Sequence, residues 1–382
     1  MWLSILRMVS LIGTVCGIVY CLLSLRCAIK FYSRKLRIRG GELTPPVSIL
    51  KPLCGLDPHE YESLRSHCIQ DYPEFEIIFG ISDPNDSIVS AVERLKTEFP
   101  EVRMRLVECP QRLGTNYKVS NLMQMLPQAS YDFLLINDSD INVPQDYLRR
   151  VMAPLEDPSV GMVTCLYRGI RADTVGSKLE SLGISSDFMP GVLCAKVLEG
   201  GIRFGMGSTL AFHRRTLEAI GGLKPLADYL ADDFQIGYRT SQAGLRIELA
   251  DCVVDHYLPA YSLRTFIQHQ LRWSRTIRCS RPDGYGGLVF TFVVPWSLLA
   301  VSVTGGSSWA WSLFASALIL RYAVTFVTGV LVLHDRQVWR NFWLLPIREF
   351  VAPLVWIGGY AGRRVIWRGN KFELVNGKLR PV

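Results

Sequence analysis

Hydrophobic residues gather in long runs near the two ends of this chain and in short runs between them. Met8–Leu25 is an uncharged stretch about long enough to cross a bilayer. Three more apolar runs lie near the other end, at Gly287–Thr304, Trp309–Leu333 and Phe342–Tyr360. The first two are joined by a short Gly-Gly-Ser-Ser turn, which predicts a membrane hairpin with tryptophans near an interface. We therefore expect N-terminal and C-terminal transmembrane helices.

Basic residues flank these apolar runs. They follow the first run at Arg26, Lys30, Arg34, Lys35, Arg37 and Arg39, and the last run at Arg363, Arg364 and Arg368. Positive residues concentrate on the cytosolic side of membrane segments, so we expect an uncleaved anchor, residues 1–30, with the following domain in the cytosol. A cleaved signal peptide is disfavoured, because only Arg7 precedes the run and no small-residue cleavage site follows it.

The last apolar run contains Arg348 and Glu349. Their burial in lipid is costly unless they pair or face other helices. If this run crosses the membrane, the basic tail, residues 363–382, lies outside the cytosol, against the positive-inside rule. If the run is re-entrant or interfacial, the tail stays in the cytosol, and we favour this second interpretation.

Residues 45–258 have the composition of a globular α/β domain. Strands are predicted at Val47–Leu53, Phe75–Ser82, Val102–Cys109 and Tyr131–Asn137, and helices at His59–Gln70, Ser87–Phe99 and Tyr117–Leu126. The repeated strand-helix order predicts a mostly parallel sheet, with ligands at the carboxyl ends of its strands. An interfacial segment, 259–284, and a C-terminal membrane region, 285–362, follow.

The most informative polar cluster is Asn137-Asp138-Ser139-Asp140, which comes directly after an apolar strand. Two carboxylates one residue apart, Asp138 and Asp140, can hold a divalent cation such as Mg²⁺ or Mn²⁺, and this cation would neutralise a diphosphate leaving group. A polar turn at the end of a strand explains such a triplet equally well. The metal interpretation therefore needs further sites.

Three other clusters are candidate companions. Asp83-Pro84-Asn85-Asp86 ends another strand, where a carboxylate can accept hydrogen bonds from uracil or ribose, although this composition also forms turns. Asp232 and Asp233 precede a helical segment, which an Asp alternatively caps. The segment His269-Gln270-Leu271-Arg272-Trp273 offers an arginine for phosphate and a tryptophan for stacking, or serves only as an interfacial anchor.

In order and spacing, these four clusters resemble the D, DxD, D, (Q/R)xxRW pattern of processive and lipid-directed inverting glycosyltransferases. The chain most resembles the ceramide glucosyltransferase group, glycosyltransferase family 21, including its bacterial hopanoid-associated relatives. The stretches Val47–Gly55, Gly114–Leu122 and Ala219–Leu223 also carry the resemblance. It implies a GT-A-like nucleotide-sugar-binding domain, a UDP-sugar donor and a membrane lipid acceptor.

The resemblance also implies roles for single residues. Asp233 is then the base that activates the acceptor in a single inverting displacement, and Asp138 and Asp140 bind the metal. Donor contacts are expected at Asp83, Asp86, Lys118, Asp138, Arg272 and Trp273. Lys118 is a further candidate for holding the donor, although a surface lysine on a helix explains it nearly as well.

Acceptor contacts are expected at Phe188, Met189, Asp232 and His269. The apolar segment Gly183–Leu198 either lines an acceptor entrance near the bilayer or is ordinary core.

Two residues depart from the family pattern. His269 stands where the family has Gln or Arg, and Asp140 stands where animal ceramide enzymes have Gly.

The remaining composition narrows the choice of function. A net charge of +8 would suit nucleic acid, but membrane topology explains the flanking basic residues better. Ten cysteines without a CxxC pair indicate a reduced domain without structural zinc.

We therefore expect an integral membrane hexosyltransferase that moves one sugar from a UDP-sugar to a lipid hydroxyl. UDP-glucose and ceramide are the leading pair. A hopanoid-directed N-acetylglucosaminyl or glycosyl transferase is the first alternative, with diacylglycerol as a further acceptor. A processive polysaccharide synthase is more remote, because few membrane spans leave little room for a polymer channel. In a non-enzymatic binder, the acids would only cap helices and close turns.

Overall fold

The computed structural model of the protein describes residues 1–35, 44–170, 172–367 and 369–382. Arg37, Arg39 and Arg368 of the flanking basic residues lie outside them. The chain divides into two compact units, each assembled from separate stretches of sequence. The helical unit comprises Met1–Arg37, Arg171–Val197 and Ala260–Asn370, and the sheet unit comprises Ile38–Ile170, Leu198–Pro259 and Lys371–Val382.

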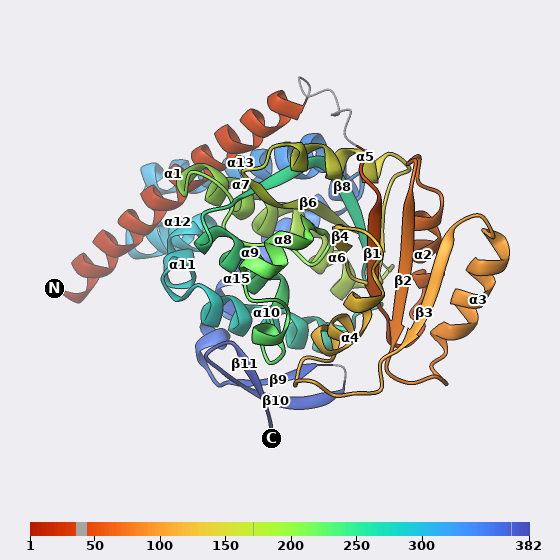
Figure 1. Cartoon of the computed structure of the whole chain (residues 1–382). Helices are drawn as coiled ribbons and strands as arrows, with labels where there is room; N and C mark the ends of the chain where they lie inside the picture. The colour runs from red at the N-terminus through yellow and green to blue at the C-terminus, as the bar shows by residue number, and fades with distance from the viewer. Residues whose placement is uncertain (36–43, 171, 368) are drawn as a thin grey trace. The chain divides into compact units, whose positions relative to one another are not determined.

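A mixed sheet forms the centre of the sheet unit (Figure 1). Its strands, in order across the sheet, are β3 (Arg103–Glu108), β2 (Phe75–Ile81), β1 (Val47–Pro52), β4 (Phe133–Ile136), β7 (Leu210–His213), β6 (Val160–Ile170), β8 (Arg246–Tyr257) and β5 (Ile141–Asn142). Strands β3, β2, β1 and β4 run parallel, as do β6 and β8. Strand β7 is antiparallel to both of its neighbours, and β5 is antiparallel to β8. The expected mostly parallel sheet is confirmed.

Helices connect these strands, three of them at the stretches that the sequence predicts. They are α2 (Glu60–Cys68), α3 (Ile88–Glu98), α4 (Tyr117–Met125), α5 (Tyr147–Met152), α8 (Arg214–Ala219) and α9 (Asp232–Gln242), with short 3-10 turns η1 (Leu126–Gln128), η2 (Ala153–Glu156) and η4 (Lys224–Leu226). The predicted strands and helices end within two residues of the observed ones. Strand β1 is buried along its whole length, as expected for a strand with a parallel neighbour on each side.

The end of the chain also forms strands. Residues 363–382, treated above as a basic tail, contain β9 (Arg364–Trp367), β10 (Asn370–Val375) and β11 (Lys378–Pro381). Strands β10 and β11 pair antiparallel around Asn376 and Gly377, which both have positive φ. Asn-Gly is a common sequence for so tight a turn, because both residues tolerate this conformation. Residues 371–382 belong to the sheet unit.

Helices make up most of the helical unit. They are α1 (Trp2–Lys35), α6 (Val175–Gly183), the π-helix η3 (Ile184–Phe188), α7 (Met189–Leu198), α10 (Leu263–Ser280), α11 (Pro282–Gly287), η5 (Leu288–Thr291), α12 (Val293–Val303), α13 (Ser308–Thr325), the π-helix η6 (Phe326–Val332), α14 (Gln337–Asn341), η7 (Phe342–Leu344) and α15 (Leu345–Tyr360). Residues 171–197 belong here, although the expected domain of residues 45–258 includes them.

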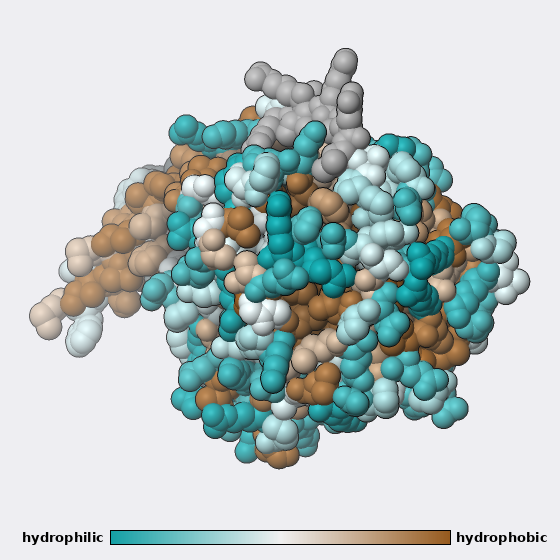
Figure 2. All heavy atoms as spheres, viewed as in Figure 1, coloured by the Kyte–Doolittle hydropathy of each residue, from teal (hydrophilic) through white to brown (hydrophobic). Residues whose placement is uncertain are grey.

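Several of these helices are suited to a membrane. Among the described residues, Trp2–Ser33, Ser308–Val332 and Gln337–Tyr360 are long and apolar enough to cross one. Pro282–Thr291 and Val293–Val303 are a further candidate, bent by 50°, if together they form one span. Apolar side chains cover much of the surface of α1 (Figure 2). The expectation of membrane helices in both terminal regions is confirmed by length and composition.

Small residues allow α1 and α12 to approach closely. A Cβ atom at Gly13 would lie 2.4 Å from the Trp296 ring, and one at Gly17 would lie 2.6 Å from Cβ of Val293. This spacing of glycines is common where membrane helices pack without a hydrophobic driving force between them. Arg7 Nε donates to the Val303 carbonyl at 2.8 Å, so α1 begins beside the end of α12.

Two arginines of the helical unit pair with acidic residues. Arg321 Nε donates to Glu349 Oε1 at 2.8 Å, and its Nη2 donates to Asp187 Oδ1 at 2.7 Å. Arg348 Nε lies 3.0 Å from Asp187 Oδ2. This pairing confirms that the charges of the last apolar run face other helices, where their burial is offset by opposite charge.

The C-terminal hairpin constrains the topology of this last run. Residues 371–382 and β1 to β8 form one compact unit, so they must lie on the same side of any membrane. If α12 and α13 cross and return, a crossing by Gln337–Tyr360 would put residues 371–382 on the wrong side. We therefore infer that this stretch enters the membrane without crossing it.

Cysteine labelling tests this inference. Cys54, which is exposed in the sheet unit, serves as the reference site in the otherwise unchanged protein. Two further proteins carry Cys54→Ser together with either Val382→Cys, which reports on the C-terminus, or Ser308→Cys, which reports on the α12–α13 turn. In sealed vesicles, a membrane-impermeant maleimide should reach Cys54 and Val382→Cys from one side and Ser308→Cys only from the other. Detergent permeabilisation provides the control for reactivity. Labelling of Val382→Cys together with Ser308→Cys would contradict the inference.

Candidate active site

The candidate residues of the sheet unit lie at the carboxyl edge of the parallel strands. Strand β2 ends just before Asp83–Asp86, and β4 ends just before Asn137–Asp140. Both strands pair in parallel with β1, so their carboxyl ends lie at the same edge of the sheet. Ligands of open α/β sheets bind at this edge.

Lys118, in the first turn of α4, joins two of the expected site residues. Its Nζ lies 2.8 Å from Asp138 Oδ1 and 3.1 Å from Asp232 Oδ2. Burial would lower the pKa of Lys118, but the carboxylates of Asp138, Asp232 and Asp233 outweigh burial and raise its pKa above the ordinary value. Lys118 is therefore a half-buried cation paired with two carboxylates of the cluster, rather than a freely solvated surface lysine.

Gly207 brings Asp138 and Asp233 together. Its N–H donates to Asp233 Oδ2 at 2.8 Å, and its carbonyl accepts from Asp138 N at 3.1 Å. A Cβ atom at Gly207 would lie 2.6 Å from Asp138 Oδ2 and 3.4 Å from Asp233 Oδ2. The site therefore needs glycine here, because the backbone passes between two carboxylates.

Asp233 has the electrostatics of a base that works near neutral pH. Burial, together with the neighbouring Asp232 carboxylate, raises the pKa of Asp233 to about 6. The helix-capping alternative does not describe this residue, because the N-cap position of α9 is Ala231 and both acids lie in the first turn. Asp233 instead accepts from the backbone of Gly207 and Phe234.

Asp140 faces a histidine that sequence analysis did not select. Its Oδ2 lies 3.1 Å from Nε2 of His256, on β8, while its Oδ1 is buried and has no hydrogen-bond partner in the part of the chain that the structure describes. Burial would raise the pKa of Asp140, but His256 and Lys51 outweigh it and hold the pKa below the ordinary value. Among the described residues, no three His, Cys, Asp or Glu side chains form a closed metal site. The free carboxylate oxygen fits a cation that takes most of its ligands from phosphate and water.

A buried lysine, Lys51, holds the DxD segment by hydrogen bonds. Lys51 Nζ donates to Asn137 Oδ1 at 2.9 Å and to the Asp138 carbonyl at 3.1 Å. His67 completes the group, with Nε2 2.8 Å from Asn137 Nδ2. Burial lowers the pKa of Lys51 to about 7. Its signal in the sequence is a lysine inside an otherwise apolar strand, where lysine is rare.

Asp86 holds the loop that follows β1. Its carboxylate oxygens accept from Gly55 N at 3.0 and 2.9 Å, and Oδ1 also accepts from Ile88 N. Asp83 is exposed and accepts from Asn85 N at 2.9 Å, which is the turn that its sequence also predicted. On the loop that Asp86 holds, Asp57 N donates to Glu60 Oε2 at 2.9 Å.

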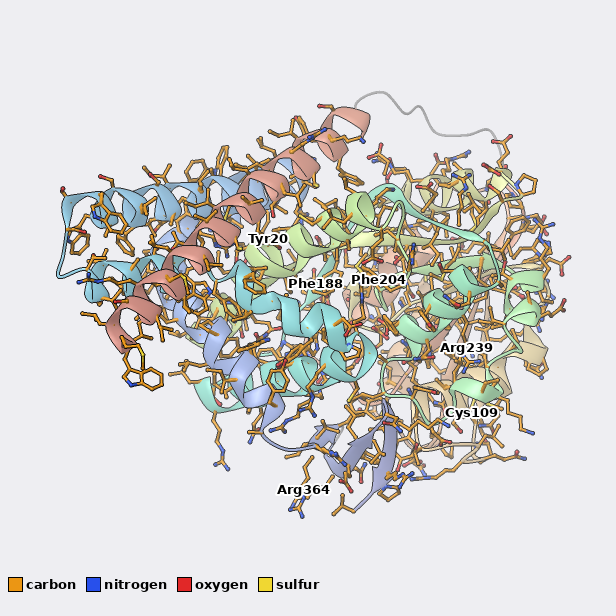
Figure 3. The ribbon with its side chains drawn as sticks, turned by 90° about the vertical axis from the view of Figure 1, so that its left-hand side faces the viewer. Tyr20, Cys109, Phe188, Phe204, Arg239 and Arg364 are labelled. Atoms are coloured by element: carbon orange, nitrogen blue, oxygen red, sulfur yellow. The ribbon has the colours of Figure 1, made fainter. Side chains whose placement is uncertain are left out.

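The remaining expected residues belong to the helical unit. His269 and Trp273, on α10, have ring centroids 5.4 Å apart, and Trp273 meets Phe188 edge to face at 5.5 Å. Figure 3 labels Phe188 among the helices. Glu180, on α6, is almost fully buried and lies 3.2 Å from His269 Nδ1. It also accepts from Gln270 Nε2 at 2.8 Å.

The expected residues thus form two groups. The sheet unit brings together Lys118, Asp138, Asp140, Asp232 and Asp233, with Asp83 and Asp86 on the neighbouring loop. The helical unit holds Phe188, Met189, His269, Arg272 and Trp273. His256, Lys51, Gly207 and Glu180 are the additional residues that contact these groups.

Comparison with known proteins identifies relatives of this chain. The chain is 22% identical to ceramide glucosyltransferase 3 of Caenorhabditis elegans, over 99% of this chain and 84% of the relative. It is 26% identical to a beta-monoglucosyldiacylglycerol synthase of Synechocystis sp., over 41% of this chain and 32% of that protein.

A solved mannosyltransferase from Pyrobaculum calidifontis, in complex with GDP-mannose and Mn²⁺, has a similar fold. The TM-score is 0.53 at 20% identity, and the match covers 91% of this chain and 98% of the mannosyltransferase. The sequence profile of glycosyl transferase family 21 matches residues 9–380, nearly the whole chain. The protein therefore belongs to glycosyltransferase family 21.

Proposed function

We propose that this protein transfers one hexose from a UDP-sugar to a hydroxyl group of a membrane lipid, with UDP-glucose and ceramide as the leading pair. The observation that carries the proposal is Asp233, a carboxylate whose pKa is raised to about 6 and that lies beside Asp138 at the nucleotide-binding edge of the sheet. The names of the two glucosyltransferase relatives support a lipid acceptor and glucose.

Asp233 is the proposed acceptor base. In its ionised form it takes the proton of the lipid hydroxyl while that oxygen forms a bond to the anomeric carbon. The bond from this carbon to the diphosphate breaks on the opposite face, so the configuration of the sugar inverts. Gly207 N–H and Lys118 hold the carboxylates in place during this step.

The donor diphosphate is the proposed ligand of the remaining polar groups. Lys118, 2.8 Å from Asp138, supplies a positive charge, and Arg272 and Trp273 supply a second cation and a stacking surface. Asp138 and Asp140, with His256 beside them, would hold a divalent cation that offsets charge on the departing diphosphate. Asp83 and Asp86 are the proposed contacts to the nucleoside.

The acceptor side is proposed for Phe188, Met189, Asp232 and His269. Phe188 and Trp273 present adjacent aromatic rings in the helical unit, which suits a lipid chain. Diacylglycerol is a second acceptor candidate, because one relative is a beta-monoglucosyldiacylglycerol synthase. We propose that the sheet unit lies on the cytosolic face, since basic residues follow the first membrane helix.

Product analysis tests the proposed reaction. Membranes that contain the protein are incubated with labelled UDP-sugars and with ceramide, diacylglycerol or a hopanoid polyol, in Mn²⁺ or in EDTA, and the glycolipid is identified by mass. Asp233→Asn should lower kcat by about 10²–10⁴-fold, because the general base is lost. Asp132→Asn, an exposed acid of the same unit, is the matched control.

The outcomes separate the alternatives. Elongation of the product beyond one sugar would favour a polysaccharide synthase. Full activity of Asp233→Asn would contradict the role of Asp233 as the base, and the absence of any glycolipid from the wild-type protein would favour the non-enzymatic binder. Equal glycolipid formation in Mn²⁺ and in EDTA would contradict the divalent cation proposed at Asp140.

The pH dependence of kcat follows from the environment of Asp233. The base must be ionised, so kcat should fall as the pH drops through about 6, the raised pKa of Asp233. Asp232→Asn removes the carboxylate that raises this pKa, so its acidic limb should move to lower pH. Asp132→Asn should leave the limb in place. If the acidic limb of kcat lies at the same pH in Asp232→Asn as in the wild type, Asp233 is not the titrating base.

Lys51→Met tests the support of the DxD segment. The substitution leaves Asn137 Oδ1 and the Asp138 carbonyl without their donor and removes a buried charge. Because such hydrogen bonds contribute about 1.5–3 kcal/mol, donor affinity should fall roughly 10–100-fold, measured by titration with UDP-sugar. Lys96→Met, at an exposed pair with Glu93, is the control. Unchanged donor affinity in Lys51→Met would rule out this support.

A further inference from the structure

A short backbone segment leads directly into the proposed base. Residues 227–230, which we call the strap, connect η4 to the start of α9, where Asp232 and Asp233 lie. The carbonyl groups of the strap face two sides, because those of Ala227 and Tyr229 accept from Asn116 and that of Asp228 accepts from Leu379. Its position therefore sets where the first turn of α9 begins.

On one side the strap is held by Asn116, the N-cap residue of α4. Asn116 N donates to the Ala227 carbonyl at 2.8 Å, and Asn116 Nδ2 donates to the Tyr229 carbonyl at 2.7 Å. The same side-chain amide lies 3.3 Å from Asp232 Oδ1. The helix that carries Lys118 and the strap that carries the acids are therefore tied together at this residue.

On the other side the strap is held by the C-terminal hairpin, residues 371–382. Leu379 N donates to the Asp228 carbonyl at 2.7 Å, and Leu230 N donates to the Gly377 carbonyl at 3.1 Å. Lys378 Nζ lies 5.3 Å from the centre of the Tyr229 ring. In Figure 1 the hairpin lies beside the chain that enters α4.

The hairpin is docked by its apolar side chains. Phe372, Leu374 and Leu379 are all buried, which alternation along two paired strands allows. Thr115 links the pieces, since its hydroxyl lies 3.0 Å from Asp228 Oδ1 and 3.2 Å from the Leu379 carbonyl. Removing the hairpin would expose these side chains and leave the Asp228 carbonyl and Leu230 N–H without partners.

We propose that the C-terminal hairpin is a positioning element of the active site, which fixes the strap and thereby holds Asp232 and Asp233 against Lys118. The inference rests on the role proposed for Asp233. A reacting group displaced by about 1 Å can lose about 10²-fold in rate, so a loosened strap is sufficient to impair the reaction. The hairpin itself touches none of the proposed reacting groups.

Leu379→Pro removes the N–H that bonds the strap and keeps an apolar residue. In the full-length membrane enzyme, kcat should fall about 10–100-fold while the KM for the UDP-sugar changes by less than about threefold, because the proposed nucleoside and cation contacts lie on other loops. Leu379→Val, which keeps the N–H, should resemble the wild type. An unchanged kcat in Leu379→Pro, or an equal loss in Leu379→Val, would overturn the proposal.

Hydrogen exchange gives a readout that needs no acceptor. In the solubilised full chain, peptides that cover the strap should exchange at least about tenfold faster in Leu379→Pro, while peptides of β1 stay unchanged. Faster exchange in both regions would show general unfolding and overturn the local role. A loosened strap with full kcat would overturn the positioning role. If the wild-type protein makes no glycolipid, the proposed function fails, but the exchange result still tests whether the hairpin holds the strap.

Thr115→Val and Thr115→Ser form a second matched pair. Thr115→Val removes the hydroxyl at the junction of hairpin and strap, whereas Thr115→Ser keeps it. The loss of kcat should appear only in Thr115→Val. In the double variant with Leu379→Pro, Thr115→Val should lower kcat little further, because both changes release the same strap. Independent, multiplying losses would contradict a shared strap.

Discussion

The sheet unit depends on one electrostatic contact, the Lys118 ammonium group between the carboxylates of Asp138 and Asp232. The two acids come from distant parts of the chain, the end of β4 and the start of α9. Without a positive charge between them, the buried carboxylate of Asp232 and the partly exposed carboxylate of Asp138 would repel one another. Asn116 caps the helix that carries Lys118 and also bonds the strap before α9. Asn116 therefore fixes both the helix that carries Lys118 and the segment that leads to Asp232.

The parts of the fold that the sequence predicts are those set by local patterns. Apolar runs of strand length bounded by turn residues located β1 to β4, and the DxD segment followed from the end of β4. Contacts between distant residues were not accessible in this way. His256 meets Asp140 from a strand more than a hundred residues later, and Gly207 is needed only because two carboxylates close around it. The C-terminal hairpin did leave a local signal, Asn376-Gly377 between alternating apolar residues, but basic composition suggested a tail.

The helical unit handles its buried charges by pairing them. Arg321 and Arg348 face Asp187 and Glu349, so two positive and two negative groups cancel. Glu180 similarly holds His269 and Gln270 on α10, one turn before Arg272 and Trp273. His269 therefore stands in the family's Gln or Arg position with a buried carboxylate as its partner. A fixed ring at this position also fixes the face of α10 that presents Trp273 to Phe188.

The sheet unit leaves its charges unbalanced, in contrast to the helical unit. Asp138, Asp140, Asp232 and Asp233 supply four carboxylates, whereas Lys51 and Lys118 supply two ammonium groups, an excess of two negative charges if all are ionised. Such an excess is costly in a partly buried site unless a ligand neutralises it. Part of the cost is visible in Asp233, whose pKa is raised to about 6. One divalent cation would match the excess, and Asp140 Oδ1 has no hydrogen-bond partner among the described residues. The charge balance of the whole cluster thus supports the proposed cation.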